Sequence, residues 1–458
     1  MCGIVGVSNH KEAAKLAFLG LYALQHRGEE AAGIVTYDGK EIHVVKERGL
    51  VVDAFDESVL NRLKGHAAIA HTRYSTTGSS NAKNIQPLLV THRKKSIAVV
   101  HNGNLTNTEE LYARLEESGS IFQTTMDSEV IVHLLAKTPN GDLKAWFTRV
   151  LTQLKGAFSL IFLVEDTIIG ARDPQGFRPL CLGKLDDGYI LASESCALDL
   201  TKAEFVREIE PGEVVFITGN KIESMFLPDI KKEKKAYCIF ENIYFARPDS
   251  SIFGDNVYQV RKRLGAQLAK EHPAKADFVM AIPDSGNSAA LGYSEEAGIP
   301  YEIGMIRNHY IGRTFIQPSQ FLRDFRVRVK LNPIRDVLKG KRVVVVEDSI
   351  VRGTTSRSRI EELRAVGCKE IHMRISCPPI KHPCFYGIDF PDTNELIAHS
   401  KTVKEIADFI KVDSLEFLSL EGMLSVMKGP KNFCNACFSG KYPVAPPETK
   451  SKYLLESK

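Results

Sequence analysis

The sequence predicts two successive mixed α/β domains, the first built on stacked antiparallel sheets and the second on a parallel sheet. In the first half, short apolar segments follow one another closely and are often separated by Gly, Asp or Asn, as antiparallel strands are. In the second half, a strand–helix–strand succession indicates parallel strands joined by right-handed crossovers. Between them, residues 228–236 form a charge-rich segment that predicts the domain boundary.

The elements of the first half can be predicted from the periodicity of apolar residues. Residues 11–28 are predicted to be helical because Ala17, Leu21 and Leu24 recur at three- and four-residue spacing, and Gly28 supplies a stop. Two more segments, 127–137 and 142–154, are predicted to be helices. The predicted strands are 42–45, 67–71, 96–101, 158–164, 167–171, 189–193 and 213–217.

The second half follows a different pattern. The predicted elements are a strand at Val279–Pro283, a β-branched strand at Arg342–Val346, a helix at Ser356–Val366 and a strand at Ile371–Ile375. We therefore expect a first domain over residues 1–230, a second over 231–445 and a polar tail over 446–458.

Length and composition narrow the class of protein. A chain of 458 residues exceeds one typical core, which agrees with two domains. The net charge of +4, from 60 basic and 56 acidic residues, is too balanced to indicate nucleic-acid binding. No apolar stretch reaches the roughly 20 residues of a membrane helix, and no signal peptide is evident. Nine dispersed cysteines argue against a disulfide framework, so we expect a cytoplasmic protein with metal-binding or catalytic thiols and no membrane partner.

Cys2 stands at the very start of the chain, before the apolar run Gly3–Val7. Removal of Met1 would leave one residue carrying both a thiol and a free α-amine. An α-amine has a pKa of about 8, so it can act as a base for a thiol that is otherwise only slightly ionised. The alternative is an ordinary small residue on the first strand.

Three further segments supply what amide hydrolysis needs: His71–Thr76, His101–Leu105 and Thr125–Glu129. Taken singly, each has a structural interpretation, such as a hairpin turn, a surface arginine or a helix cap. Taken together, they offer an oxyanion hole and two anchors of opposite charge for an amino acid. The residues and roles are Asn102 and Gly103 for the oxyanion, Arg73 for the substrate carboxylate and Asp127 for its amine.

The start of the chain at Cys2, the turn His26–Gly28 and the segments His71–Thr76 and His101–Leu105 follow one another in this order. Together they resemble the N-terminal nucleophile (Ntn) glutamine amidotransferases of class II over roughly the first 220 residues. The resemblance implies a four-layer αββα glutaminase that releases ammonia. It implies that Cys2 is the nucleophile, that Asn102 and Gly103 form the oxyanion hole, and that Arg73 and Asp127 bind glutamine. The histidines of the motifs, His26, His71 and His101, are expected to be structural, and maturation is expected to need only loss of Met1.

The strand Val343–Val346 runs into a second group of polar residues at 347–356. The adjacent acids Glu347 and Asp348 suit ribose hydroxyls or a hard cation such as magnesium. Small residues at the start of the following helix suit a phosphate. The segment is not a Walker A loop, because no Gly-Lys-Ser/Thr follows; the alternative is a plain strand-to-helix connection.

The segment resembles the signature of type I phosphoribosyltransferases, which bind 5-phosphoribosyl-1-pyrophosphate (PRPP). The resemblance implies that Glu347 and Asp348 contact ribose and magnesium, that Ser349 also binds PRPP, and that Arg352, Gly353, Thr354 and Thr355 bind the 5′-phosphate. The turn Asp284, Ser285 and Gly286 resembles the pyrophosphate loop, with Ser285 a further magnesium ligand. Such amidotransferases commonly have aspartate at the position of Glu347, which leaves the metal geometry open.

The stretch Arg307–Lys330 holds six basic residues and one acid, Asp324. We interpret it as a lid that neutralises the departing pyrophosphate and excludes water, since a long basic loop inside a compact domain is unusual unless it moves. The alternative is a solvated charged surface.

Cys434 and Cys437 form a C-x-x-C pair, which alone is compatible with a redox pair or half a zinc site. Sequence spacing cannot join them to the distant Cys238 and Cys384. The contexts of these four cysteines resemble the ligands of the iron–sulfur branch of the amidophosphoribosyltransferase family, which implies a [4Fe–4S] cluster, with zinc as the rival. The other candidates, Cys181, Cys196, Cys368 and Cys377, are expected to be buried.

The two halves together resemble that family over nearly the whole chain. The resemblance implies the first step of de novo purine synthesis, in which glutamine, PRPP and water give 5-phosphoribosylamine, glutamate and pyrophosphate. It also implies internal ammonia transfer, inhibition by purine nucleotides, and a homo-oligomer, either tetramer or dimer. The alternatives are an Ntn amidotransferase with another acceptor and a non-enzymatic sensor of PRPP or nucleotides.

Overall fold

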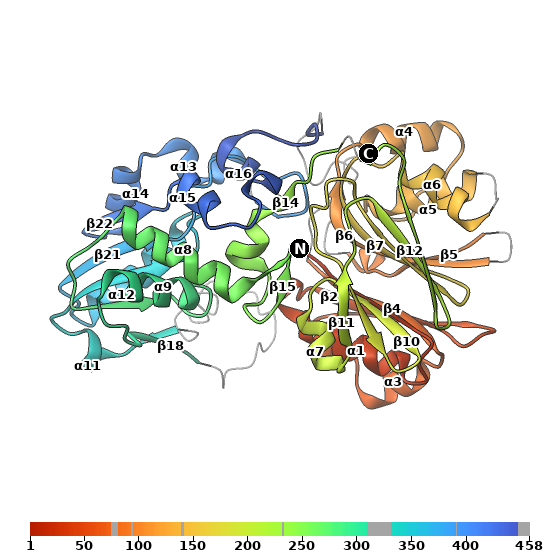
Figure 1. The fold of residues 1–458 in the computed structure, drawn as a ribbon, viewed down its shortest axis with the longest axis horizontal. Coiled ribbons are helices and arrows are strands. Elements are labelled where there is room, and N and C mark those ends of the chain that lie inside the picture. Colours follow the sequence, from red (N-terminus) through yellow and green to blue (C-terminus); the bar gives the residue numbers. More distant parts are fainter. Residues whose placement is uncertain are drawn as a thin grey trace.

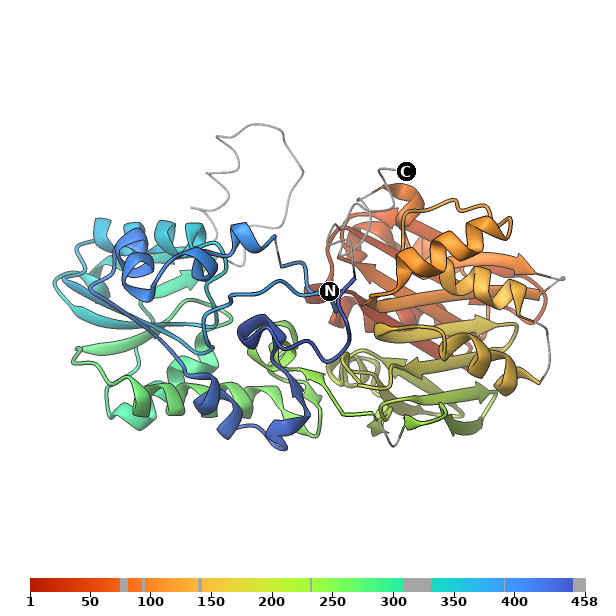
Figure 2. The ribbon, with the colours of Figure 1, turned by 90° about the horizontal axis from the view of Figure 1, so that it is seen from above.

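The computed structural model describes residues 1–74, 81–92, 95–138, 142–230, 233–308, 331–390 and 392–447. The two halves of the chain form two lobes that lie side by side, with the N-terminus between them (Figures 1 and 2). None of the helices in the described part of the chain has the length and apolarity that crossing a bilayer requires. The domain limits at residues 230 and 445 stay predictions.

The first lobe contains two antiparallel sheets. The seven-stranded sheet has the order β11-β9-β10-β1-β4-β2-β3, and the six-stranded sheet has the order β13-β12-β8-β7-β6-β5. The first sheet comprises β1 Gly3–Ser8, β2 Ala31–Tyr37, β3 Ile42–Arg48, β4 Ala67–Arg73, β9 Cys181–Leu185, β10 Gly188–Ala192 and β11 Glu204–Glu208. The second comprises β5 Leu88–His92, β6 Lys95–Leu105, β7 Gly156–Val164, β8 Thr167–Arg172, β12 Glu213–Thr218 and β13 Lys221–Phe226.

Helices cover the outer face of each sheet, so the lobe has four layers. One apolar core lies between the sheets, and two others lie between each sheet and its helices. The helices on the seven-stranded sheet are α1 Ala13–Ala23, α2 Val51–Ala54, α3 Glu57–Arg62 and α7 Cys196–Thr201; those on the six-stranded sheet are α4 Thr108–Glu117, α5 Ser128–Lys137 and α6 Leu143–Leu151. The predicted αββα arrangement is confirmed.

Strand β1 explains why the sequence starts with a continuous apolar run rather than an alternating one. It pairs with β10 on one side and β4 on the other, and both of its faces are covered. All six of its residues are buried. Cys2 therefore sits at the start of a central strand, where its position is held from both sides.

One helix prediction for this lobe was too long, and strands β2, β5, β9, β11 and β13 were not predicted. The helix expected over 11–28 ends at Ala23 and is followed by a 3₁₀ turn at Gln25–Arg27, because the chain must turn back to enter β2. Strand β2 was not predicted, since its Ala-Ala-Gly start carries little apolar signal. Gly33 in β2 lies so close to the backbone at Gln86 that a Cβ on Gly33 would be 2.1 Å from the main-chain oxygen of Gln86.

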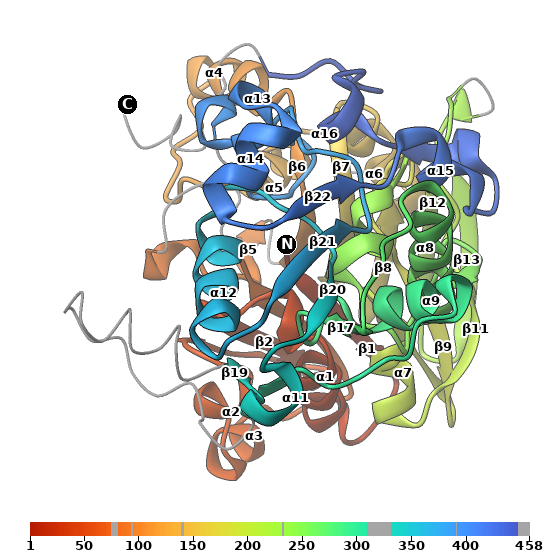
Figure 3. The same ribbon diagram turned by 90° about the vertical axis from the view of Figure 1, so that its left-hand side faces the viewer.

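The second lobe is built on a parallel sheet of order β17-β20-β21-β22, which confirms the predicted crossover topology. Its strands are β17 Phe278–Ala281, β20 Arg342–Glu347, β21 Glu370–Ile375 and β22 Ser414–Phe417. Helices α8 and α9 cover one face, and α12 and α14 the other (Figure 3). Their bounds, with those of the shorter helices, are α8 Val257–Glu271, α9 Asn287–Ala297, α11 Arg335–Leu338, α12 Thr354–Ala365, α13 Ile397–Ser400, α14 Val403–Ile410 and α15 Leu420–Ser425.

Short elements join the lobes. Strand β14 (Tyr237–Cys238) pairs in parallel with β23 (Phe433–Cys434), so Cys238 lies opposite Cys434. A π-helix, Glu241–Phe245, follows β14, and α16 (Ala436–Ser439) follows β23. The remaining two-stranded pairs are β15 Ser251–Ile252 with β16 Asp255–Asn256, and β18 Met305–Arg307 with β19 Leu331–Pro333.

Candidate functional site

Four of the five residues predicted to handle glutamine line one pocket in the first lobe, with about 270 Å³ of free space. Cys2 precedes β1, Arg73 ends β4, Gly103 lies on β6, and Asp127 begins α5. The fifth residue, Asn102, precedes Gly103 on β6. These side chains are thus brought together by two neighbouring strands of one sheet, β1 and β4, by β6 of the other sheet and by the start of α5.

Asn102 is oriented by the nucleophile's own backbone. The Cys2 nitrogen donates to Asn102 Oδ1 over 3.4 Å, and the Cys2 thiol lies 3.5 Å from the Tyr74 oxygen. The Asn102 Nδ2 atom is buried and has no hydrogen-bond partner among the described residues. A buried, unpaired amide donor on a side chain bonded to the nucleophile's backbone is suited to a developing oxyanion.

Gly103 is required to be glycine by the backbone around it. Its φ angle is +156°, and a Cβ would lie 2.1 Å from the Ala157 oxygen on the paired strand β7. No residue with a side chain fits there, so the backbone of β6 reaches the pocket wall directly beside Cys2.

Asp127 is a buried carboxylate held by hydrogen bonds. Its Oδ2 accepts from the Leu105 nitrogen over 3.0 Å, and its Oδ1 lies 3.5 Å from His101 Nδ1. Burial by itself opposes ionisation, but His101 and these hydrogen bonds outweigh it and lower the pKa of Asp127. The carboxylate is therefore charged at neutral pH and can bind an ammonium group, while His101 has a supporting position.

Arg73 supplies the pocket with a positive charge, the counterpart of the negative charge of Asp127. Its Nη1 contacts the Asn84 oxygen and lies 3.4 Å from Met126 Sδ. The other lining residues, which the sequence did not single out, are Tyr74, Gln86 and Met126. Gln86 Oε1 accepts from the His101 nitrogen over 2.7 Å, so it too supports the pocket. Residues 75 and 76 of the predicted motif lie outside the described residues.

Arg27 forms a buried charged network behind Cys2. Its Nε donates to the Cys2 oxygen over 2.9 Å, and its two Nη atoms donate to Glu241 over 3.0 and 2.8 Å. It also pairs with Glu194. Burial alone would lower the pKa of Arg27, but the two carboxylates outweigh it and raise that pKa. The sequence motif His26–Gly28 includes this arginine, but the sequence does not show that Arg27 pairs with Glu194 and Glu241.

The second group of predicted residues lies at the carboxyl ends of two adjacent strands. The turn Asp284–Gly286 follows β17, and residues 347–355 end β20 and lead into α12. A Cβ on Gly286 would be 2.5 Å from the Val346 oxygen, so glycine permits close approach of the two loops. The Ser285 hydroxyl bonds to the Asp348 carboxylate.

The two adjacent acids are buried. Burial, and then the neighbouring Asp348, raise the pKa of Glu347 to about 8. Burial also raises the pKa of Asp348. Ser356 Oγ donates to Glu347 over 3.0 Å, and Ser349 Oγ donates to Asp348. Two buried carboxyl groups that resist ionisation are a suitable place for a cation to stabilise their charged forms.

The predicted phosphate loop makes a left-handed turn into a helix. Gly353 has a φ of +75° and caps α12, whose first residues are Thr354 and Thr355. Arg352 pairs with Glu395 over 2.5 Å, and Asp284 pairs with Arg307. Of the predicted lid, residues 309–330 lie outside the described residues.

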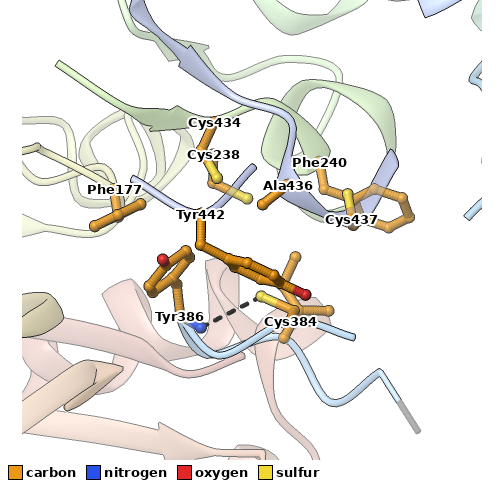
Figure 4. Close-up of a pocket in the computed structure, with 10 residues that line it drawn as sticks. Phe177, Cys238, Phe240, Cys384, Tyr386, Cys434, Ala436, Cys437 and Tyr442 are labelled. Atoms are coloured by element: carbon orange, nitrogen blue, oxygen red, sulfur yellow. Dashed lines mark hydrogen bonds between the residues drawn. The ribbon is translucent and has the colours of Figure 1, made fainter. Parts of the chain in front are cut away.

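Cys238, Cys384, Cys434 and Cys437 line one pocket between the lobes, with about 340 Å³ of free space (Figure 4). The rest of the wall is apolar or aromatic and includes Phe177, Phe240, Tyr386 and Tyr442. Burial raises the pKa of Cys238 to about 11 and those of Cys434 and Cys437 further. Within the described residues, however, no group of three or more His, Cys, Asp or Glu side chains is placed to hold a metal ion.

All nine cysteines are free thiols, and the four that were expected to be buried bystanders, Cys181, Cys196, Cys368 and Cys377, are buried.

Comparison with known proteins agrees with both halves of this arrangement. Residues 71–200 match the family model described as a glutamine amidotransferase domain, and residues 252–389 match the one described as a phosphoribosyl transferase domain.

Curated relatives match over nearly the whole chain. The chloroplastic amidophosphoribosyltransferase of Glycine max is 50% identical over 456 residues, which cover 99% of this chain and 80% of the relative. The amidophosphoribosyltransferase of Archaeoglobus fulgidus is 47% identical over 456 residues, which cover 98% of this chain and 99% of the relative.

Two solved structures are similar throughout. One is described as the allosteric regulatory enzyme of purine biosynthesis, with a TM-score of 0.92, 46% identity and 98% coverage of both chains. The other is glutamine PRPP amidotransferase from B. subtilis complexed with ADP and GMP, with a TM-score of 0.92, 46% identity and full coverage of both chains.

Proposed function

The chain belongs to the amidophosphoribosyltransferase family, and from that premise we propose which of its residues carry out the reaction. The enzyme is a pentosyltransferase of purine biosynthesis: glutamine, PRPP and water give 5-phosphoribosylamine, glutamate and pyrophosphate. The sequence-based assignment of family, fold and activity is confirmed. The roles of individual residues are proposals.

The first half-reaction takes place in the pocket at Cys2. After loss of Met1, the α-amine of Cys2 takes the thiol proton, and the sulfur attacks the side-chain amide of glutamine. Asn102 Nδ2 and the Gly103 N–H stabilise the oxyanion, ammonia leaves, and water hydrolyses the resulting thioester. Arg73 and Asp127 hold the carboxylate and amine of glutamine. The observation that carries this assignment is the buried, unpaired Nδ2 of Asn102, a side chain whose Oδ1 accepts from the Cys2 nitrogen.

The second half-reaction takes place where β17 and β20 end. Arg352, Gly353, Thr354 and Thr355 bind the 5′-phosphate, and the turn Asp284–Gly286 binds the pyrophosphate. Glu347 and Asp348 hold the ribose hydroxyls. Ammonia attacks the anomeric carbon as pyrophosphate leaves.

Magnesium fits the donor set of that site. Glu347 and Asp348 are buried carboxyl groups with raised pKa, and Ser285 reaches Asp348. When bound, the ion supplies charge stabilisation for the departing pyrophosphate.

The four-cysteine pocket is proposed to hold a [4Fe–4S] cluster with a structural role. Single zinc ions hold thiolate sulfurs about 3.8 Å apart. The pocket of about 340 Å³ lined by four cysteines is larger than a single ion needs, and this supports the larger cluster. Anaerobic purification should give about four iron and four sulfide per chain; one zinc per chain with no sulfide would overturn this assignment.

Ammonia is proposed to pass directly between the two sites. The pKa of Tyr244 in the π-helix is raised, first by burial and then by the charges of Asp348 in one site and Tyr74 in the other, so this half-exposed residue lies within electrostatic range of both sites. The test compares phosphoribosylamine formed with free ammonia released from glutamine; complete release to solvent would reject transfer.

Inhibition by nucleotides is proposed from a relative, and assembly and location are proposed from the family resemblance of the sequence. The B. subtilis relative was solved with ADP and GMP, which supports inhibition by purine nucleotides. We also propose a homo-oligomer, dimer or tetramer, and a cytoplasmic location.

The decisive experiment replaces the nucleophile. Cys2→Ala is expected to abolish glutamine-dependent synthesis and to leave ammonia-dependent synthesis intact, because the second site is unchanged. Cys368→Ala, which alters a buried cysteine in the second lobe, is the control and should retain both activities. A Cys2→Ala enzyme that still uses glutamine would refute the assignment.

A further inference from the structure

The strand that carries the oxyanion hole is in contact with a segment from the other half of the chain, Phe385–Gly387. Asn104, one residue after Gly103 on β6, donates from Nδ2 to the Phe385 oxygen over 3.1 Å. Gly387 lies against Gly103 itself: a Cβ on Gly387 would be 2.9 Å from the Gly103 carbonyl carbon and oxygen. These two contacts join positions 281 and 284 residues apart along the chain.

The segment is firmly held on its far side. Arg178, which is fully buried, donates from Nε to the main-chain carbonyl oxygen of Tyr386 over 3.0 Å. The Tyr386 ring stacks on Phe177 with centroids 4.3 Å apart, and its hydroxyl donates to the Val444 oxygen. Phe385–Gly387 is therefore a fixed surface rather than a loose loop.

Gly103 is consequently enclosed from two directions. A Cβ on Gly103 would meet the Ala157 oxygen of β7 at 2.1 Å, and a Cβ on Gly387 would meet the Gly103 carbonyl group at 2.9 Å. An oxyanion donor is effective only when its N–H is placed to within about 0.5 Å. Since neither glycine has a side chain, the backbones at Gly103 and Gly387 are in direct contact, and this contact helps to set the position of Gly103.

We propose that Phe385–Gly387 completes the oxyanion hole from the second half of the chain, with Asn104 and Gly387 as positioning residues. The inference rests on the proposed roles of Cys2, Asn102 and Gly103. Since Arg73 and Asp127 bind the other end of glutamine, the segment affects the tetrahedral intermediate and leaves ground-state binding unchanged.

The first test is Gly387→Ala. Its methyl group must displace the Gly103 carbonyl group and Cα, and the Gly103 N–H is bonded to that Cα. We therefore expect kcat for glutamine hydrolysis to fall about tenfold or more, with KM within about twofold. Gly119→Ala is the matched control: Gly119 also has a positive φ, +83° against +98°, but nothing lies within 4 Å of its Cβ position. Ammonia-dependent synthesis should remain normal in both variants, which shows that they fold.

A second variant and a binding measurement separate positioning from general damage. Asn104→Ala should lower kcat in the same direction. The γ-aldehyde analogue of glutamine, which forms a tetrahedral adduct with a thiol, should bind about tenfold more weakly to Gly387→Ala, whereas glutamate binding should not change.

Equal aldehyde affinity in Gly387→Ala and the wild type, or an equal loss in Gly119→Ala, would overturn this inference while the Cys2→Ala result still supports the glutaminase. If Cys2→Ala retained glutamine hydrolysis, the proposed function itself would fail.

Discussion

The guanidinium of Arg27 donates from Nε to the main-chain oxygen of Cys2 over 2.9 Å. Its remaining donors meet Glu194 and Glu241, and all three side chains are fully buried. Glu241 belongs to the π-helix that follows Cys238, so the charge network ties the nucleophile to the junction between the lobes. The position of Cys2 thus depends on residues outside its own pocket.

Arg27→Lys is expected to destabilise the protein by about 3–5 kcal/mol, because one ammonium group cannot satisfy two buried carboxylates. Chemical unfolding measures the change. Arg357→Lys, at an exposed pair with Glu361, is the control and should cost less than about 1 kcal/mol. Equal small effects of the two substitutions would show that the buried network contributes no more than a surface pair.

Asp127→Asn is expected to raise KM for glutamine about 10- to 100-fold, since a neutral amide replaces a carboxylate that the structure keeps ionised. The control is a substrate: glutaramate, which lacks the α-amino group, should be hydrolysed equally by variant and wild type. A slower hydrolysis of glutaramate by the variant than by the wild type would mean that Asp127 acts elsewhere in the reaction.

Glu395→Gln is expected to lower KM for PRPP about two- to fivefold with kcat unchanged. The Glu395 carboxylate pairs with Arg352 over 2.5 Å and so competes with the 5′-phosphate for that cation. Both side chains are more than half exposed, which limits the effect. Glu421→Gln, on α15, serves as control; an unchanged KM in Glu395→Gln would argue against this competition.

Stability of the first lobe is expected to fall with acidification through His71. Burial, and then Arg73, lower the pKa of His71 to about 3, against about 6.5 when unfolded. Below pH 6.5 the unfolded chain therefore binds a proton that the folded chain does not, and stability is lost as pH drops.

Between pH 7 and pH 5 this group accounts for a loss of about 2 kcal/mol. Urea unfolding of wild type and His71→Leu at both pH values measures it. Between pH 7 and pH 5, the free energy of unfolding of the variant should fall by about 2 kcal/mol less than that of the wild type. The same fall in both proteins would contradict the assignment of the loss to His71.

Much of the fold could be predicted because local periodicity and burial agree. The β-branched strand before Glu347 and the helix after Gly353 were predicted to within a few residues, since a buried parallel strand is continuously apolar and a helix repeats every three to four residues. Strand β2 escaped prediction because Gly33 is selected by close backbone approach, and a helix was extended through His26 because nothing local shows that the chain must turn.

The order of residues along the chain was enough to determine the chemistry: a terminal thiol, an amide donor, anchors of opposite charge and paired acids before a phosphate loop. Only the tertiary structure decided what surrounds them. It pairs Cys238 with Cys434, buries Arg27 between two distant carboxylates and sets Gly387 against Gly103. Contacts between residues hundreds of positions apart depend on how sheets and lobes pack, and no local pattern in the chain encodes them.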